Sequence, residues 1–154
     1  MTSPAERLAE LGLTLPPVTA PVAAYVPAVR TGRFVYVSGQ LPVVDGKLPA
    51  TGKVGDEVSA EDAAAMARTC ALNALAAAAA AAGGLDAIAR IVKVLGFVAS
   101  APGFNGQPQV INGASELLIE VFGEAGRHAR SAVGVAELPL DAPVEVELIA
   151  EVRD

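Results

Sequence analysis

Two charged residues stand inside alternating apolar segments near the end of the sequence. Arg130 lies at the start of the segment 129–137, and Glu145 lies among valines in the segment 144–151. Charged side chains are rarely buried unless they are paired or functional. A guanidinium can hold a carboxylate through two hydrogen bonds, and a carboxylate can activate water as a general base. We therefore expect a small site in which neighbouring strands present Arg130 and Glu145.

The elements that must position this pair follow from the hydrophobic periodicity. A period of two predicts strands and a period near 3.6 predicts helices. Strands are expected at residues 24–29, 33–38, 88–100, 129–137 and 144–151, and helices at residues 4–13, 60–82 and 108–122. After the first short helix, the order β-β-α-β-α-β-β is typical of an α+β fold: a single mixed sheet with two helices packed on one face. The other face would be open and lined by small and apolar residues, so we expect it to pack against copies of the chain.

The length of 154 residues fits one domain with one core. Residues 1–21 combine a short amphipathic helix with the extended stretch L-P-P-V-T-A-P, and we expect them to form an extension packed on the body. Residues 22–154 would form the domain itself. The chain is 53% hydrophobic but only 4% aromatic, so its core must consist mainly of Ala, Val, Leu and Ile.

Charge and composition disfavour two classes of partner. The net charge of −6 and the scattering of eleven Lys and Arg residues argue against binding to nucleic acid. The apolar run in the alanine-rich helix ends at Gly83, so we expect no bilayer-spanning segment. The only cysteine, Cys70, cannot form an intrachain disulfide, which is compatible with a reducing compartment. We expect a cytoplasmic protein with no membrane partner.

Three stretches together resemble one known family. They are Y-V-P-A-V-R-T-G with V-Y-V-S-G-Q-L-P (residues 25–42), I-V-K-V-L-G-F-V (91–98), and R-S-A-V-G-V-A-E-L-P with V-E-V-E-L-I-A (130–150). They are similar to the RidA/YjgF family, the reactive-intermediate (enamine/imine) deaminases once labelled endoribonuclease L-PSP. The third stretch is the most specific. The longer N-terminus resembles the longer branch of that family.

The resemblance implies a chorismate-mutase-like fold and a homotrimer with three clefts between subunits. In the family's deaminases, an arginine at the position of Arg130 binds the substrate carboxylate, and a glutamate at the position of Glu145 assists the attacking water. The residues that match Tyr25, Ser38 and Gly39 line the cleft.

Two further positions follow from the resemblance. An asparagine on the family's second helix matches Asn112, although this helix and the following loop differ in length from the usual pattern. Ala132 stands where many members carry cysteine. Because hydrolysis needs no covalent intermediate, the missing thiol affects substrate preference more than the reaction. Backbone groups near Ala132 are expected to orient the substrate nitrogen.

Two other reactive side chains are interpreted as structural. His128 is interpreted as a structural or rim residue on the side of the strand that carries Arg130, and Cys70 as a core residue. The spacing of these two residues fits no familiar metal site, and no phosphate-binding loop is present. We therefore expect no metal and no cofactor.

The resulting hypothesis is hydrolysis of a small 2-imino or enamine acid to the 2-keto acid and ammonia in a cleft between subunits. The expected partners are a small carboxylate substrate and further copies of the chain. Arg130 and Glu145 could instead form structural ion pairs or hydrogen bonds. The cleft could also serve a non-catalytic carboxylate-binding module, or a hydrolase of another carbonyl-nitrogen compound. A ribonuclease or translation inhibitor is a third alternative, which the acidic charge disfavours.

Overall fold

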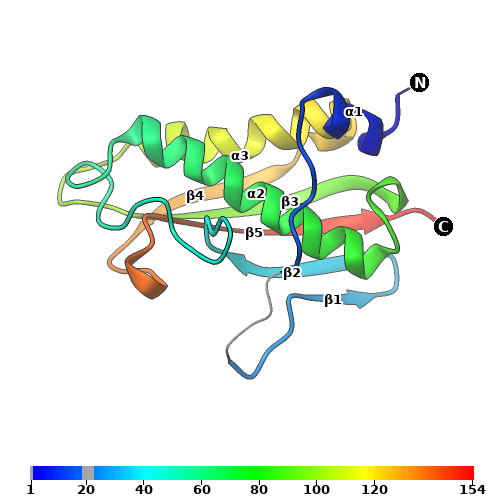
Figure 1. Cartoon of the computed structure of the whole chain (residues 1–154), viewed down its shortest axis with the longest axis horizontal. Coiled ribbons are helices and arrows are strands. Elements are labelled where there is room, and N and C mark those ends of the chain that lie inside the picture. The colour runs from blue at the N-terminus through cyan, green and yellow to red at the C-terminus, as the bar shows by residue number, and fades with distance from the viewer. Residues whose placement is uncertain (1, 19–22) are drawn as a thin grey trace.

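A single mixed β-sheet carries two long helices, and a short helix precedes it in the chain (Figure 1). The computed structural model describes residues 2–18 and 23–154. In chain order, the elements are α1 (Pro4–Glu10), β1 (Ala28–Thr31), β2 (Phe34–Gln40), α2 (Ala60–Ala82), β3 (Ile88–Ala99), α3 (Gln107–Phe122), β4 (Ala129–Val135) and β5 (Val144–Val152). This order confirms the predicted α+β class.

The strands lie in the order β1-β2-β5-β3-β4, and only β3 and β4 are parallel. Parallel neighbours need a crossover connection, which α3 supplies between β3 and β4. β5 then returns to pair with the other edge of β3. The prediction that the strands of Arg130 and Glu145 are neighbours is therefore wrong, because β3 lies between β4 and β5.

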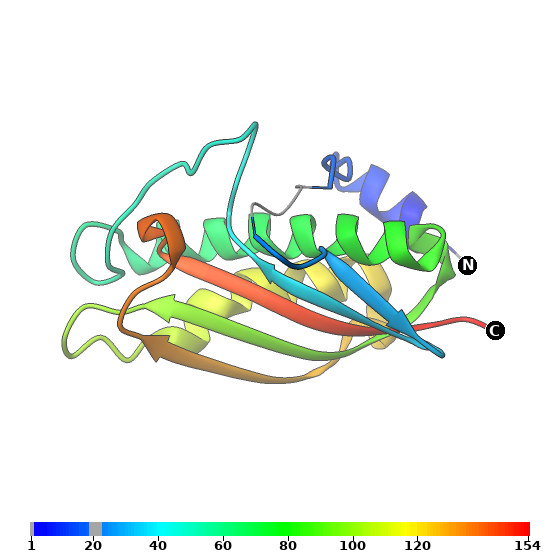
Figure 2. The same ribbon diagram turned by 90° about the horizontal axis from the view of Figure 1, so that it is seen from below.

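Both long helices cover the same face of the sheet and lie behind the strands in Figure 2. The two helices approach each other closely at Gly113, where an added Cβ would lie 2.0 Å from the carbonyl oxygen of Ala64. A second close approach joins helix and sheet, because a Cβ on Gly96 of β3 would lie 2.4 Å from the Ile111 side chain. Small residues thus let α3 pack closely against both α2 and the sheet.

The alanine-rich helix α2 has the length and hydropathy of a membrane-spanning helix. Length and hydropathy alone do not distinguish it from a membrane-spanning helix, because the whole helix counts and not the alanine run alone. Within the protein, 67% of the apolar window of α2 is buried, as in a core helix. The Ser59 side chain caps its first turn by accepting from the Asp62 backbone N–H (3.0 Å). Gly83 ends the helix in the left-handed conformation that glycine favours.

The first strand is shorter than predicted. β1 begins at Ala28 and not at residue 24, since Pro27 just before it has no N–H to donate to a ladder. The second strand runs beyond its predicted end to Gln40. Its register against β5 shifts between Val37 and Gln40, which places a β-bulge at Ser38 and Gly39.

The N-terminal helix packs on the body of the protein. Leu8 is buried, and the Ala5 backbone N–H donates to the Asp86 carboxylate (2.9 Å). A capping box between Ser3 and Glu6 begins the helix, which ends at Glu10, before the predicted residue 13. The final part of the predicted extension, residues 19–21, lies outside the described residues, as does residue 22.

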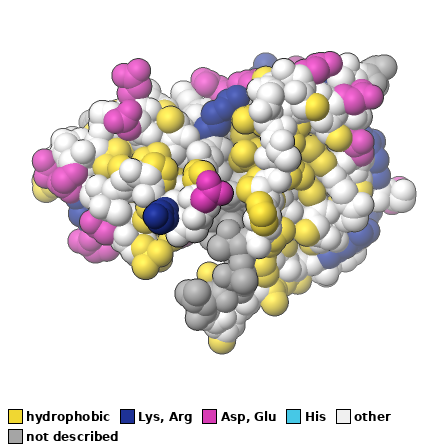
Figure 3. Space-filling model, in the orientation of Figure 1, with side chains coloured by type: hydrophobic (Ala, Val, Ile, Leu, Met, Phe, Trp, Pro, Cys, Tyr) yellow, Lys and Arg dark blue, Asp and Glu magenta, His cyan; other side chains and the backbone are white. Residues whose placement is uncertain are grey.

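The sheet face opposite the helices carries exposed apolar side chains together with glutamates. Phe34 and Tyr36 of β2 and Val133 of β4 are 38%, 47% and 45% exposed. Apolar side chains gathered on such a face are typical of an interaction surface. On the helix side, which Figure 3 shows, Lys and Arg are scattered and form no broad basic area.

Candidate active site

Arg130 reaches from β4 toward the start of α3. Its Nη1 donates to the Ser115 hydroxyl (3.1 Å) and its Nη2 to the Pro108 carbonyl (3.2 Å). A guanidinium has five N–H groups, so these two bonds leave three available. Arg130 lines an open pocket of about 260 Å³ together with Asn112, Ser115, Ile119, Arg127 and His128. This arrangement fixes the cation and still presents it to a ligand.

The imidazole of His128 lies beside this cation in a defined orientation. Its Nδ1 is 2.6 Å from the Gly126 carbonyl oxygen, and its Nε2 is 2.8 Å from the Ser115 hydroxyl. Burial lowers the pKa of His128, as does the positive charge of Arg130, although the hydrogen bond to Gly126 opposes them. The imidazole is therefore neutral at pH 7.

A second group of predicted residues gathers at the bulge of β2. An added Cβ on Gly39 would lie 2.6 Å from the Glu145 carboxylate, so the missing side chain gives this carboxylate its space. The Ser38 hydroxyl donates to the Val26 carbonyl (2.6 Å) and holds the segment that includes Tyr25 beside the bulge. Tyr25 is 53% exposed. One region of the folded protein, at the bulge of β2, thus contains Tyr25, Ser38, Gly39 and Glu145.

Glu145 is half-buried, and its environment favours the neutral form of its carboxyl group. Burial raises the pKa of Glu145, and the nearby charge of Glu147 raises it further. No ion pair to Glu145 exists within the described part of the chain. A carboxylate with a raised pKa is a stronger base once it is ionised, which suits the activation of water.

The two groups face opposite sides of the sheet. Arg130 is paired with Val94, which is buried beneath the helices, whereas Glu145 is paired with Phe97, three residues farther along β3. Paired residues share a face of the sheet, and residues three apart on a strand point to opposite faces. One chain therefore presents the cation and the carboxylate in different directions.

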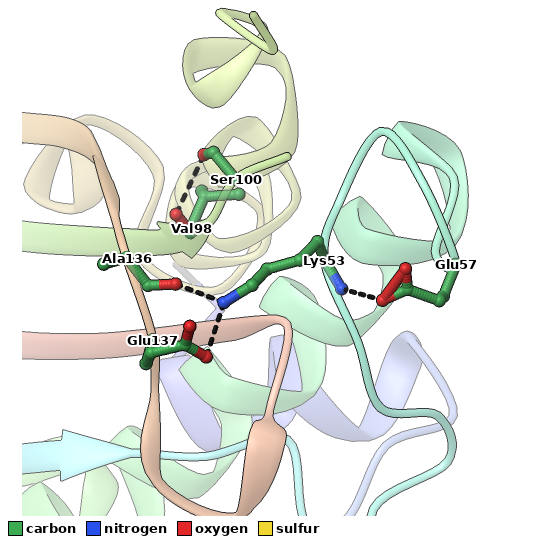
Figure 4. A network of polar contacts seen from close by, with 6 residues as sticks. All are labelled: Lys53, Glu57, Val98, Ser100, Ala136 and Glu137. Carbon is green, nitrogen blue, oxygen red and sulfur yellow. Dashed lines mark hydrogen bonds and ion pairs between the residues drawn. The ribbon is translucent and has the colours of Figure 1, made fainter. Parts of the chain in front are cut away.

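A polar network fixes the chain that leads into β5 and Glu145 (Figure 4). The Lys53 ammonium donates to the Ala136 carbonyl and pairs with Glu137 at 2.6 Å, and its backbone N–H donates to Glu57 (2.9 Å). The Gly52 N–H donates to the Asp141 carbonyl (2.9 Å). The loop before α2 thus fastens the connection between β4 and β5.

The predicted site residues therefore divide into two sets. Asn112 and Ala132 lie on the side of Arg130: Asn112 lines its pocket, and Ala132 is two residues along the same face of β4. Sequence reasoning missed Ser115, which accepts from the guanidinium. The sequence feature that could have identified Ser115 is its spacing of three residues from Asn112, because this spacing places both side chains on one face of a helix.

Two further interpretations concern the remaining reactive side chains. Cys70 is fully buried in the core, as predicted. His128 lines the pocket beside Arg130 and bonds to Ser115, so it lies closer to the site than a rim position. Across residues 2–18 and 23–154, no three His, Cys, Asp or Glu side chains come together as metal ligands would.

Comparison with known proteins identifies relatives over almost the whole chain. Protein TCP17 of Trypanosoma cruzi is 46% identical over 151 residues, which cover 97% of this chain and 94% of that protein. The crystal structure of Atu1372, a protein of unknown function from Agrobacterium tumefaciens, is 51% identical with a TM-score of 0.88, over 96% of this chain and 91% of that one. E. coli TdcF with bound serine is 29% identical with a TM-score of 0.66, over 89% of this chain and 94% of that one. The family model described as "YjgF/chorismate mutase-like, putative endoribonuclease" matches residues 5–152, so the chain belongs to the YjgF family.

Proposed function

We propose that the protein hydrolyses small 2-imino or enamine acids to 2-keto acids and ammonia, in clefts between the subunits of a homotrimer. The observation that supports this most is the division of the site within one chain. Among the described residues, Arg130 has no carboxylate partner and Glu145 has no cationic partner. The region of Arg130 lacks a carboxylate base, and the region of Glu145 lacks a cation. An adjacent protomer can supply the missing group to each region.

In this reaction, Arg130 binds the substrate carboxylate through the N–H groups that Ser115 and Pro108 leave available. Glu145 of the neighbouring protomer accepts a proton from water, whose oxygen attacks the imine carbon. That proton passes to the substrate nitrogen and gives the carbinolamine. The proton of its new hydroxyl is then transferred to the amino group, the C–N bond breaks, and ammonia leaves as the keto group forms. Backbone groups near Ala132 orient the nitrogen.

The modest chemical demand suits so sparse a site. Imines of this kind already hydrolyse in water, and each tenfold acceleration needs about 1.4 kcal/mol of barrier reduction. Positioning of a water molecule and the substrate by one cation and one base can supply such an amount. No covalent intermediate is required, so Ala132 in place of cysteine leaves the reaction possible.

Non-catalytic binding of a carboxylate is the second candidate. Serine, which carries a carboxylate, is bound in the structure of TdcF. Saturable binding of a 2-keto acid to the protein, with no acceleration of imine hydrolysis, would select this candidate.

A competition assay tests the activity. An amino-acid oxidase generates the 2-imino acid in the presence of semicarbazide, and the protein should divert the imine to the 2-keto acid and so lower semicarbazone formation. Arg130→Ala should abolish this effect. Arg68→Ala is a matched control, because it removes a surface arginine that pairs with Glu120 on the helix face. Equal activity of Arg130→Ala and the wild type would refute the assignment.

A mixing experiment tests whether the site forms between protomers. Arg130→Ala and Glu145→Gln are each expected to be inactive alone. When the two chains are co-expressed in equal amounts and assemble at random, about a quarter of the clefts regain both native residues. Activity should return to about that fraction of wild type. A site built within one chain would leave the mixture inactive.

A further inference from the structure

A continuous chain of hydrogen bonds links Arg130 to the only histidine of the protein. The Arg130 Nη1 group donates to Ser115 (3.1 Å), Ser115 Oγ lies 2.8 Å from His128 Nε2, and His128 Nδ1 lies 2.6 Å from the Gly126 carbonyl oxygen. Ser115 is 8% exposed, so water does not readily replace these partners.

The Gly126 carbonyl oxygen, at one end of this series of hydrogen bonds, determines the direction of every bond in it. A carbonyl oxygen only accepts, so Nδ1 of His128 carries a proton and donates it to Gly126. In the neutral imidazole, Nε2 is then a bare acceptor, and the Ser115 hydroxyl donates to it. The hydroxyl proton is thus engaged by His128, and only the oxygen of Ser115 faces the guanidinium.

Protonation of His128 must reverse the middle bond. Nε2 then carries a proton and donates to Ser115 Oγ, whose two lone pairs accept from His128 and from Arg130. The hydroxyl proton has to point elsewhere, and the open side of Ser115 is the pocket that it lines. The pocket gains a hydroxyl donor and a second positive charge, and both favour an anion.

We propose that Ser115 and His128 are positioning residues for Arg130, and that His128 takes up a proton when a carboxylate binds in this pocket. The identity of that carboxylate as a 2-imino or 2-keto acid rests on the proposed function. The coupling itself rests on the hydrogen-bond geometry. By reciprocity, acidification strengthens carboxylate binding, and the carboxylate raises the pKa of His128.

Other charges near His128 must be separated from this effect. On its own segment, these are Arg130 and Arg127, and Glu124 pairs with Arg127 at 3.2 Å. From β3, the Arg90 guanidinium donates to the Arg127 carbonyl (2.9 Å). Lys93 and Glu116 complete the set: Lys93 is opposite Ala129 in the sheet, and Glu116 follows Ser115 on α3.

The groups that share an element with His128 or face it from β3 are arginines, a lysine and glutamates. Burial raises the pKa of Glu145, and this residue would face the ligand from the neighbouring protomer. Each binding series is therefore repeated in the Glu145→Gln background.

The single histidine makes the test direct. The ¹⁵N shifts of its ring nitrogens identify the Nδ1–H tautomer, and a titration followed by NMR gives the pKa of His128 without and with saturating pyruvate. We expect the Nδ1–H tautomer and a pKa that pyruvate raises. A second measurement, pyruvate affinity between pH 5 and 8, should show about a fivefold or greater gain toward acid, the lower range of coupling between sites.

Three variants separate positioning from simple structural support. His128→Gln can still accept from Ser115 through its amide oxygen but cannot titrate, so its affinity for pyruvate should no longer rise toward acid pH. Ser115→Ala should abolish the coupling, because it removes the hydroxyl that joins His128 to Arg130 in both protonation states. Thr69→Ala removes a hydroxyl of α2 that donates to the Ala65 carbonyl of its own helix (3.4 Å), and should change neither the pKa of His128 nor the coupling.

Three outcomes would overturn the proposal: an Nε2–H tautomer, a pKa of His128 that pyruvate does not move, or the absence of pyruvate binding at every pH. None of these measurements needs turnover. If the coupling is found but imine hydrolysis is not accelerated, the proposed function fails and this inference holds. If hydrolysis is accelerated but no coupling is found, the proposed function holds and this inference fails.

Discussion

Arg130 and Glu145 point to opposite faces of one sheet, and β3 separates their strands. Under the proposed function, a single chain holds only half of the site, since a small substrate cannot contact both residues of the same protomer. The open sheet face, where exposed Phe34, Tyr36 and Val133 accompany Glu145, is the surface through which the proposed trimer would associate. Association through that face would bring the carboxylate of one protomer to the guanidinium of the next.

Enlarging Gly39 should impair catalysis more than folding. An alanine Cβ there would lie 2.6 Å from the Glu145 carboxylate, which can swing aside because it is the end of a flexible side chain. We expect Gly39→Ala to keep its thermal midpoint within a few degrees and to lose about tenfold or more in kcat, since a small misplacement of a catalytic group is costly. Thermal melts and the semicarbazide assay measure the two effects. A large loss of stability with normal kcat per folded molecule would contradict this account.

The acid limb of the pH–activity profile should respond to Glu147. The charge of Glu147 is one of the two causes that raise the pKa of Glu145, after burial. Glu147→Gln removes that charge, so the pKa of Glu145 falls and activity should persist to lower pH. The pH dependence of kcat/KM measures the shift. Glu116→Gln, an exposed change on α3, should leave the limb in place, and an unchanged limb in Glu147→Gln would argue against Glu145 as the base.

Much of the architecture follows from local sequence signals. Ser59 before two acidic residues and Gly83 after the last alanine define α2 to within a residue, because caps act within one turn. The alternation around Val146 likewise defines β5. These features depend on neighbours in the sequence, so periodicity and capping rules suffice to find them.

The order of the strands and the direction of the site residues do not follow from such signals. Nothing in the sequence of β4 and β5 shows that β3 lies between them, because pairing partners are chosen by the packing of the whole sheet. Gly113 is a further example: a glycine is a poor helix former by its sequence, yet in the structure it is the point where α2 approaches α3 at Ala64. The bond from Arg130 to Ser115 also depends on tertiary packing and left only a weak spacing signal.

The stability of the protein should decline in mild acid through His128. Its pKa in the folded protein is lower than the usual 6.5, so the unfolded chain binds the proton more readily. The contribution is fully present above about pH 6.5 and is lost as pH falls from there toward the folded pKa. Denaturant unfolding at several pH values should show a steeper decline for the wild type than for His128→Gln. Parallel declines would show that other groups dominate.

The Cys70 thiol should be unreactive in the native protein. Cys70 is completely buried, and burial raises the pKa of its thiol well above its usual value, with a smaller effect from the charge of Glu145. Both accessibility and thiolate content are therefore low. We expect no reaction with a disulfide reagent at pH 8 until denaturant unfolds the chain. Rapid modification under native conditions would show that α2 opens locally.

The crossing of α2 and α3 should tolerate no side chain at Gly113. A Cβ there would lie 2.0 Å from the Ala64 carbonyl oxygen, a backbone atom that cannot rotate away, so the helices must separate. Alanine favours a helix interior over glycine by about 1 kcal/mol, which offsets part of the cost. Overpacking typically costs about 1–3 kcal/mol, and more where backbone must move, so we expect a net loss of roughly 2 kcal/mol in Gly113→Ala by denaturant unfolding. Gly134→Ala is the control, because its new Cβ would meet side-chain atoms and no backbone: Gln107 Nε2 and Ser100 Oγ at 2.9 Å can rotate away, and Ser100 Cβ at 3.4 Å is in ordinary contact, so its stability should stay close to wild type. Equal stability of the two variants would mean that the helices do not approach as closely as their glycine contact implies.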